Sequence, residues 1–436
     1  MKKGKIAGLI LVSILLAGLI LHTSFNFLTS RELERELQRL RDSGQPLTLS
    51  ELQPAPLADG ENAAVYYQKA FAVMLEGTEE EQKLLNRLEW TKEEEPAVRN
   101  LLEKNRDTLW FLKQGAHRGK SQFPLDYEKG SAISLPHLAK LRTCARLLAA
   151  EALIQAEDGQ INEALDTCWV GLRLGRAVRS EPLLISQLVA FAVEQTMLTT
   201  LEKILNKADA DPAKYKLLLR ELNAKKLRDD LTKCLRAERC FGLDAFSKIQ
   251  KKEVSIEQTL VSRGKTKIGQ IIRNWFYTSY FGGPLYKREQ VYYIRLFDKA
   301  ISLSQKPYYK ISAEVEKLGE DIPPYFILTR MIIPALRGVY LSFARQEAYL
   351  GVARLGLALK IYKTEEGSYP ESLNRLTPDI IPALPRDPFT GKDYIYRREG
   401  KGFVVYSLGE NLRDDGGQWG RNRFRGEGDI VWRSQR

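Results

Sequence analysis

Histidine side chains are suited to metal binding and proton transfer, and this chain of 436 residues has only three of them. They are His22, His117 and His137, and they lie far apart in unrelated contexts. The sequence also lacks an HExxH motif, a nucleophile elbow, a phosphate-binding loop and a GxGxxG motif. These absences argue against zinc hydrolases, catalytic-triad enzymes and nucleotide-binding proteins. A pair of catalytic carboxylates leaves no short motif, so a hydrolase of that kind remains an alternative.

The cysteines are too few and too irregularly spaced for a disulfide framework or a zinc knuckle. We expect them to be buried free thiols. The chain must therefore be held together by its core, and with 44% hydrophobic residues it is long enough for two or three domains. The positions concerned are Cys144, Cys168, Cys234 and Cys240.

The N-terminus has the form of a membrane anchor. Three lysines, Lys2, Lys3 and Lys5, precede an uncharged run from Ile6 to Leu21, which continues to Leu28. About 20 apolar helical residues, rising 1.5 Å each, cross a hydrocarbon layer of ~30 Å. A cleavable signal peptide is the main alternative, but bulky residues crowd the positions where a peptidase would cut. We predict an uncleaved helix that places the chain in the membrane.

The orientation of this helix is a separate prediction. Four arginines follow it, so the charge rule does not decide which side the chain faces. A short basic leader before an apolar run is nevertheless typical of a signal that stays inside while the rest is exported. We therefore expect a single-pass protein of the bacterial inner membrane, with residues 30–436 outside the cytoplasm. The four arginines are Arg31, Arg35, Arg39 and Arg41.

Positive charge is concentrated in one part of the chain. The net charge is +12, and between Arg220 and Lys310 there are 20 lysines and arginines against 9 acidic residues, a difference of +11. In this region the segment Ile271–Tyr286 groups aromatic residues between cations. Core packing, a membrane-facing patch and stacked nucleobases each explain such a cluster. We expect core packing and no nucleic-acid partner, because an exported domain rarely meets nucleic acid.

Residues 31–339 read as successive helices separated by proline and glycine. The clearest unit is a helical hairpin in which apolar residues recur every three or four positions from Leu138 to Ala156, and Gly159 precedes the return helix. The apolar stretch Phe326–Tyr340 contains two arginines and a proline, which favours a buried helix over a second membrane span. We predict three parts: an anchor at 1–30, a helical domain at 31–339 and an α+β module at 340–436.

The C-terminal module begins with a long amphipathic helix. Ala348, Val352, Leu355, Leu359 and Tyr362 give it a continuous apolar face, and Gly367 is its natural end. Prolines then keep the chain irregular until two strands, 393–397 and 403–407, which form a hairpin around a glycine-containing turn. The predicted fold class is therefore mostly α, with an N-terminal transmembrane helix, a multi-helix body and a long helix packed on a small antiparallel sheet.

The order of these C-terminal pieces resembles the major pseudopilin of type II secretion. The matching sequence segments are ALKIYKTEEGSYPESLNRL, LPRDPFTGKDYIY, VVYSLGENLRDDGG and the final GDIVW. Together they cover roughly residues 340–432. The resemblance implies that the helix packs on the sheet and that the loop after YSLG binds calcium. At the other end Gly4 is followed by Lys5 and no glutamate enters the apolar run, so processing and assembly into a pilus are not expected.

The calcium ligands follow from the resemblance by position. Calcium takes six to eight oxygen ligands from carboxylates and carbonyls. Asparagine stands where the pseudopilin has an aspartate, and four arginines, Arg413, Arg421, Arg423 and Arg425, surround the loop. An arginine-carboxylate network in place of the ion is therefore an alternative. The candidate ligands are the carbonyl of Leu408 and the side chains of Asn411, Asp414, Asp415 and Asp429.

The function expected from these features is noncatalytic. NAAVYYQKAF, residues 62–71, resembles a segment of many bacterial membrane-anchored envelope proteins, a likeness that implies no activity. We expect a membrane-anchored envelope protein that contacts other envelope or secretion-apparatus proteins. The alternatives are a divergent secretion or pilus component, and an envelope hydrolase whose carboxylates lie in the helical body.

Overall fold

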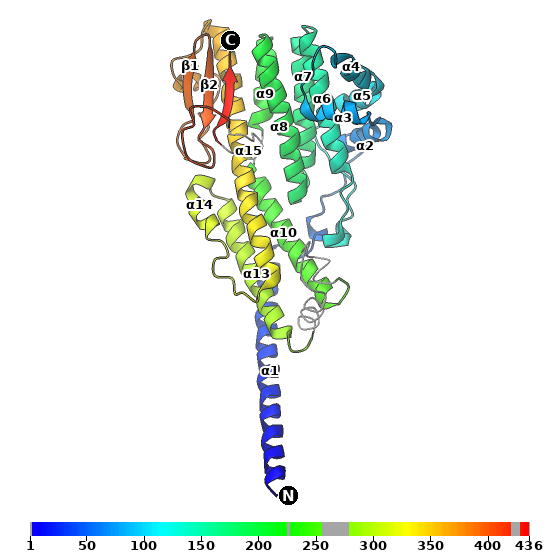
Figure 1. The fold of residues 1–436 in the computed structure, drawn as a ribbon, viewed down its shortest axis with the longest axis vertical. Helices are drawn as coiled ribbons and strands as arrows, with labels where there is room; N and C mark the ends of the chain where they lie inside the picture. Colours follow the sequence, from blue (N-terminus) through cyan, green and yellow to red (C-terminus); the bar gives the residue numbers. More distant parts are fainter. Residues whose placement is uncertain (1, 225–226, 255–278, 420–427, 436) are drawn as a thin grey trace.

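The computed structural model shows a long N-terminal helix that carries an elongated, mostly helical head (Figure 1). The structure describes residues 2–224, 227–254, 279–419 and 428–435. The expected fold class, mostly α with a C-terminal helix packed on a small antiparallel sheet, is confirmed.

The first helix, α1 (Lys2–Asp42), runs without a break from the apolar N-terminal segment into the head. The apolar side chains of its first half are exposed, from Ile6 at 58% to Leu21 at 73%. Helices α8 (Leu184–Lys207) and α15 (Ile327–Glu366) are also long and apolar enough to cross a membrane. However, 61% and 47% of their apolar 18-residue stretches are buried inside the molecule. Among the described residues α1 is therefore the apolar helix that the head leaves uncovered.

The helices between α1 and α15 build the body of the head, and several start at a proline or a polar cap. For example, Thr78 and Glu81 form a capping box at the start of α3. The other described helices of this part are α2 (Ala63–Val73), α3 (Glu79–Arg87), α4 (Glu95–Lys104), α5 (Arg106–Ala116), α6 (His137–Glu157), α7 (Ile161–Arg179), α9 (Pro212–Asn223), α10 (Leu227–Gln250), α13 (Gly283–Ser304) and α14 (Tyr308–Glu316).

The predicted hairpin is confirmed as the pair α6 and α7. Gly159 takes a φ of +78° between them, and the amide of Gln160 donates to the carbonyl of Gln155 at 2.8 Å. On its other side α7 approaches α8 closely, because a Cβ at Gly171 would stand 2.1 Å from the sulfur of Met197. All four cysteines are buried and free, as expected.

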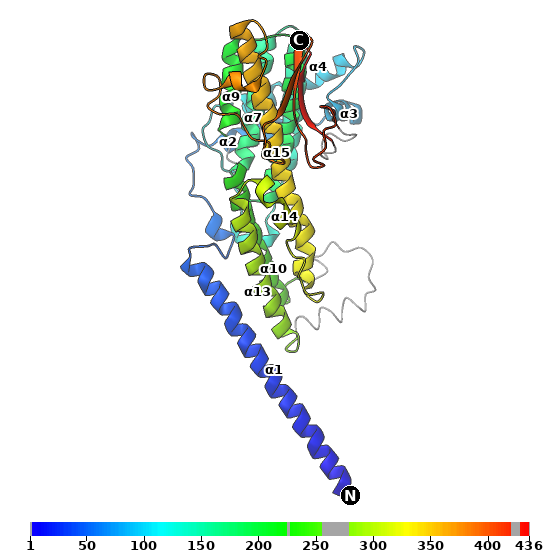
Figure 2. The same cartoon turned by 90° about the vertical axis from the view of Figure 1, so that its left-hand side faces the viewer.

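Helix α15 joins the helical body to the C-terminal sheet. It contacts α8 and α9 on one side and β2 and β3 on another (Figure 2). It ends at Gly367, which has a φ of +78° and donates its amide to the carbonyl of Lys363 at 2.8 Å. The predicted boundary between residues 339 and 340 falls inside this helix, and the division of the chain into separate domains stays a prediction.

The sheet consists of β1 (Ile395–Glu399), β2 (Gly402–Ser407) and β3 (Ile430–Ser434), all antiparallel in the order β1-β2-β3. The predicted hairpin between β1 and β2 is present, with Gly400 at a φ of +58° in its turn. Side chains alternate between the two faces of β2, so Phe403 and Val405 join the main core beneath α15 while Val404 and Tyr406 pack under the loop that follows.

Candidate functional site

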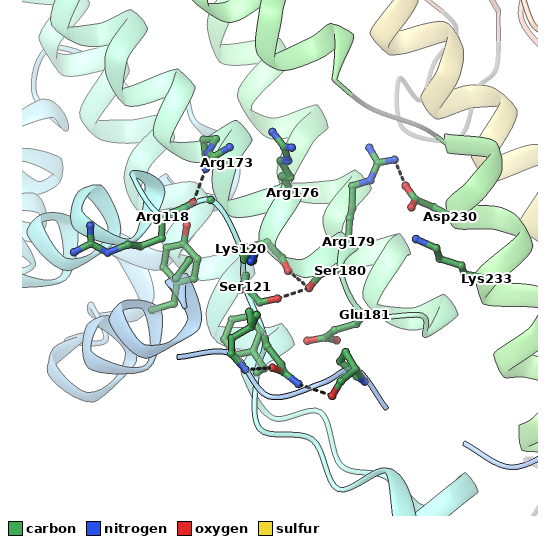
Figure 3. Close-up of a pocket in the computed structure, with 18 of the residues that line it drawn as sticks. Arg118, Lys120, Ser121, Arg173, Arg176, Arg179, Ser180, Glu181, Asp230 and Lys233 are labelled. Carbon is green, nitrogen blue, oxygen red and sulfur yellow. Dashed lines mark hydrogen bonds and ion pairs between the residues drawn. The ribbon is translucent and has the colours of Figure 1, made fainter. Parts of the chain in front are cut away.

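A basic cleft of about 480 Å³ opens in the helical body, at the level where α7 ends and α10 begins (Figure 3). Its walls come from segments that are distant in the sequence: residues 54–57, the stretch 118–123 after α5, the second half of α7 and the first turns of α10. Six basic side chains line it against three acidic ones. The basic ones are Arg118, Lys120, Arg173, Arg176, Arg179 and Lys233, and the acidic ones are Glu181, Asp229 and Asp230.

Helix α7 supplies a row of three arginines to this cleft. Arg173, Arg176 and Arg179 are three residues apart, a spacing that keeps side chains on one side of a helix over two turns. The carboxylate of Glu221, from α9, lies 3.6 Å from Arg173 and 3.4 Å from Arg176. One carboxylate thus serves two guanidinium groups.

Arg179 is the most deeply buried of the three, with 6% of its side chain exposed. It forms ion pairs with Glu194 of α8, at 3.4 Å, and with Asp230 of α10. Burial acts to lower the pKa of Arg179, but these two carboxylates more than offset it and raise the pKa. Glu194 also accepts a hydrogen bond of 2.6 Å from Gln346 of α15. Arg179 therefore ties four helices together behind the cleft.

Two lysines at the cleft, Lys120 and Lys233, are accessible to a ligand. Lys233 is exposed, and within the part of the chain that the structure describes its amino group has no hydrogen-bond or ion-pair partner. The hydroxyl of Ser121 and Nε of Arg118 also lack hydrogen-bond partners among the described residues, but both atoms are buried from solvent. Lys120 pairs with Glu61 at 3.3 Å, and both side chains are about two-thirds exposed, so Lys120 can readily exchange Glu61 for another anion.

Below the cleft lies a buried polar cluster of His137, Glu181 and Ser186. His137 Nε2 is 2.8 Å from one oxygen of Glu181, and the hydroxyl of Ser186 donates to the other oxygen. The imidazole ring stacks on Phe123 with the ring centres 4.5 Å apart. The serine proton is held by a carboxylate and not by the imidazole, which differs from the arrangement that activates a nucleophilic serine.

The structure locates the residues predicted to bind calcium in the loop between β2 and β3. Asp429 is fully buried; one oxygen accepts a hydrogen bond of 2.7 Å from the amide of Gly417, and the other has no hydrogen-bond partner among the described residues. Burial raises the pKa of Asp429, and the nearby charges of Asp415 and Asp414 raise it further, while the backbone amides of Gly417 and Asp415 oppose the shift. The orphaned carboxylate oxygen is a feature that a bound cation would satisfy.

The other predicted ligands are engaged within the protein. Asp414 accepts hydrogen bonds from the hydroxyl of Tyr406 and the amide of Gly416, both at 2.9 Å. The side chain of Asn411 donates to Asp415 at 3.0 Å, and Leu408 packs its side chain against the outer face of the sheet. Within the described ranges no three His, Cys, Asp or Glu side chains gather closely enough to hold a metal ion. The calcium site stays a prediction.

The arginines that hold this loop come from the strands. Arg397 of β1 donates to the carbonyl of Gly416 at 2.7 Å, and Arg433 of β3 donates to that of Gly417 at 2.9 Å. Among the loop arginines named from the sequence, Arg413 is exposed, and Arg421, Arg423 and Arg425 lie outside the described residues. The first half of the aromatic segment Ile271–Tyr286 also lies outside the described residues, and residues 279–286 are described.

The cleft was not predicted from the sequence. The signal that could have found it is the spacing of three between Arg173, Arg176 and Arg179, which lie outside the segment where positive charge is densest. Known proteins offer no guide to the site, because no protein-family model, no curated protein and no solved structure matches this chain.

Proposed function

We propose that this chain is a noncatalytic, membrane-anchored protein of the bacterial envelope whose basic cleft binds an acidic segment of a partner protein. The observation that carries the proposal is the excess of basic over acidic side chains lining the cleft, together with the exposed Lys233 of α10, whose amino group has no partner among the described residues. Guanidinium groups hold carboxylates through paired hydrogen bonds, and an ammonium group adds a further charge contact. An acidic peptide supplies several carboxylates to such a surface at once.

The noncatalytic part of the proposal is supported by the buried carboxylate of the cleft. Both oxygens of Glu181 are engaged, by His137 and by Ser186. A general base must reach a substrate proton, and the side chain of Glu181 is only 3% exposed. Glu181 therefore serves to fix the floor of the cleft.

The proposed location is the inner membrane, crossed once by α1, with the head outside the cytoplasm. The exposed apolar first half of α1 and the basic leader before it support this placement. Protease added to intact spheroplasts is expected to digest the head and leave a small membrane fragment. A full-length chain that survives this treatment, but is digested after the membrane is lysed, would place the head inside.

The proposed partners are envelope or secretion-apparatus proteins. One support is the pseudopilin-like sequence of residues 340–432. The other is the packing of α15 on a three-stranded sheet, which is the arrangement that the resemblance implied. The same two observations favour a second candidate, a divergent component of the secretion apparatus itself. Co-purification with a secretin or a secretion ATPase would support that candidate over a separate envelope protein.

Binding at the cleft can be tested by calorimetry on the full-length protein in detergent, with a hexaglutamate peptide as the probe. We expect binding that weakens as salt is added and that falls at least about tenfold in Lys233→Glu, a loss of about 1.4 kcal/mol. Lys83→Glu is the matched control, because Lys83 is exposed on α3, away from the cleft. Absence of binding to the wild type, or an equal loss in both variants, would refute the proposal.

A further inference from the structure

The start of α13 is fixed beside the point where the apolar run of α1 ends. The hydroxyls of Thr23 and Tyr280 are 2.7 Å apart, and His22 Nε2 donates to the carbonyl oxygen of Phe281 at 3.2 Å. The ring of His22 also lies against the ring of Tyr280, with centres 4.7 Å apart. These contacts set Tyr280 and Phe281 at the same height along α1 as His22.

Further contacts show that α1 and α13 then run side by side in the same direction. Lys287 donates to Asn26 at 2.8 Å and to Ser30 at 2.7 Å. Further on, Arg295 pairs with Glu32 and Glu36, each through a hydrogen bond of 2.9 Å. The position of Tyr280 and Phe281 relative to α1 thus rests on a continuous helix pair, and Figure 2 shows this crossing at the base of the head.

The position of His22 along α1 corresponds to the boundary between the hydrocarbon layer and the lipid headgroups. The run Ile6–Leu21 extends about 24 Å at 1.5 Å per residue, against a hydrocarbon thickness of ~30 Å. When this run spans the membrane, the hydrocarbon on the side of the head ends within about a turn of His22. Tyr280 and Phe281 then lie where hydrocarbon gives way to lipid headgroups.

The side chains at this height have the chemistry of a membrane interface. Tyr280 is 48% exposed and Phe281 is 59% exposed, which is unusual for large aromatic residues of a packed protein. Cations lie just beyond them: Arg288 stands 5.9 Å from the ring centre of Phe25, and Arg31 stands 4.5 Å from that of Phe27. Aromatic residues followed by a layer of cations match the order of acyl chains and anionic headgroups.

We propose that Tyr280 and Phe281 form a second membrane contact, inserted into the interfacial layer of the leaflet from which α1 emerges, with Arg31 and Arg288 meeting anionic headgroups. The lipid surface is favoured as the occupant because the patch is continuous with the exposed apolar face of α1. This contact is independent of what the cleft binds. It would stop the head from rotating about the axis of α1.

The proposal can be tested by lipid quenching in the full-length protein. Phe281→Cys would be labelled with an environment-sensitive fluorophore, and the protein placed in nanodiscs of equal parts phosphatidylcholine and phosphatidylglycerol. The native cysteines are all buried, so a label reaches them poorly. We expect nitroxide lipids labelled at the headgroup or high on the acyl chain to quench the fluorophore at position 281 strongly.

Trp110→Cys is the matched control, because Trp110 is 53% exposed on α5, at the far end of the head from α1 (Figure 1). Its label should not be quenched. Tyr280→Cys provides a second reporter if Phe281→Cys does not fold. Equal and weak quenching at positions 281 and 110 would overturn the proposal, as would a concentration-dependent crosslink between two copies through position 281 with no lipid quenching.

Discussion

Gly356 of α15 lies against the indole ring of Trp432 in β3, so that a Cβ at position 356 would stand only 2.4 Å from the indole nitrogen. The contact joins the predicted helix to the last strand of the predicted sheet. It also explains why the apolar seam of α15 contains a glycine at this position, where a larger residue would push the helix away from the sheet.

Gly356→Ala should therefore destabilise the protein by about 1–3 kcal/mol, because the indole is 3% exposed and has little room to move. Gly338→Ala on the same helix is the control, since a Cβ there meets nothing within 4 Å. Alanine is the better helix former by about 1 kcal/mol, so this control should be neutral or stabilising. Thermal unfolding measures both, and equal effects would show that α15 does not press on β3.

The buried carboxyl group of Glu289 should make the free energy of unfolding depend on pH. It is fully buried in α13 and accepts a hydrogen bond of 2.8 Å from the amide of Thr329, in the first turn of α15. Burial raises the pKa of its carboxyl to about 7, although the amides of Thr329 and Leu328 oppose the shift. The folded state therefore keeps a proton that the unfolded chain releases, and stability should fall as pH rises from the unfolded value of 4.5 to about 7.

Glu289→Gln should remove this loss, because an amide stays neutral and its oxygen can still accept from Thr329. The variant should match the wild type near pH 5 and exceed its stability at pH 8, by on the order of 1–3 kcal/mol. Denaturant unfolding at the two pH values measures the difference. Glu366→Gln, at the exposed end of α15, is the control. A Glu289→Gln effect of the same size at both pH values would contradict the prediction.

The buried pair of Arg179 and Glu194 should be costly to break. Arg179→Met removes the guanidinium group that pairs with Glu194, which is 0% exposed, and we expect a loss of about 3–5 kcal/mol. Arg179→Met combined with Glu194→Gln should recover much of that loss, since the buried charge is then gone. Arg99→Met is the control, because Arg99 and Asp158 are about 40% exposed and such pairs contribute at most about 1 kcal/mol. Similar losses in the two arginine variants would count against the buried pair.

Calcium binding is tested through Asp429. Its unpartnered oxygen leads us to expect that millimolar calcium raises the unfolding temperature of the wild type and that a chelator lowers it again. Asp429→Asn should abolish this response. It should also stabilise the calcium-free protein slightly at neutral pH, because the pKa of Asp429 is raised by burial and by nearby acids. A wild type that unfolds at the same temperature with calcium and with chelator has no such site.

The elements that the sequence predicted correctly are those whose signals are local. The α6–α7 hairpin, the end of α15 at Gly367 and the turn at Gly400 each depend on residues within a few positions of one another. The exposed N-terminal helix follows in the same way from an uninterrupted apolar run. Burial and backbone φ are decided locally in these cases, so spacing alone was sufficient.

The cleft depends on contacts that spacing along the chain does not reveal. Arg173 meets the carbonyl of Arg118 across 55 positions, Arg179 meets Asp230 across 51, and His137 meets Glu181 across 44. Charge counting pointed to the segment from Arg220 to Lys310, whereas the arginine row belongs to α7. Which helix faces meet is set by packing of the whole body, and no short motif records it.

Because α1 is continuous, its membrane segment and the base of the head form one rigid unit. A helix whose apolar length differs from the local bilayer thickness adjusts by tilting. Because α1 has no break between Leu21 and the residues that contact α13, such a tilt would rotate the whole head through the same angle. A thinner or thicker bilayer would thus displace the cleft parallel to the membrane, by a distance that grows with the distance of the cleft from the membrane. The lipid composition would then determine the position of the cleft relative to its partners.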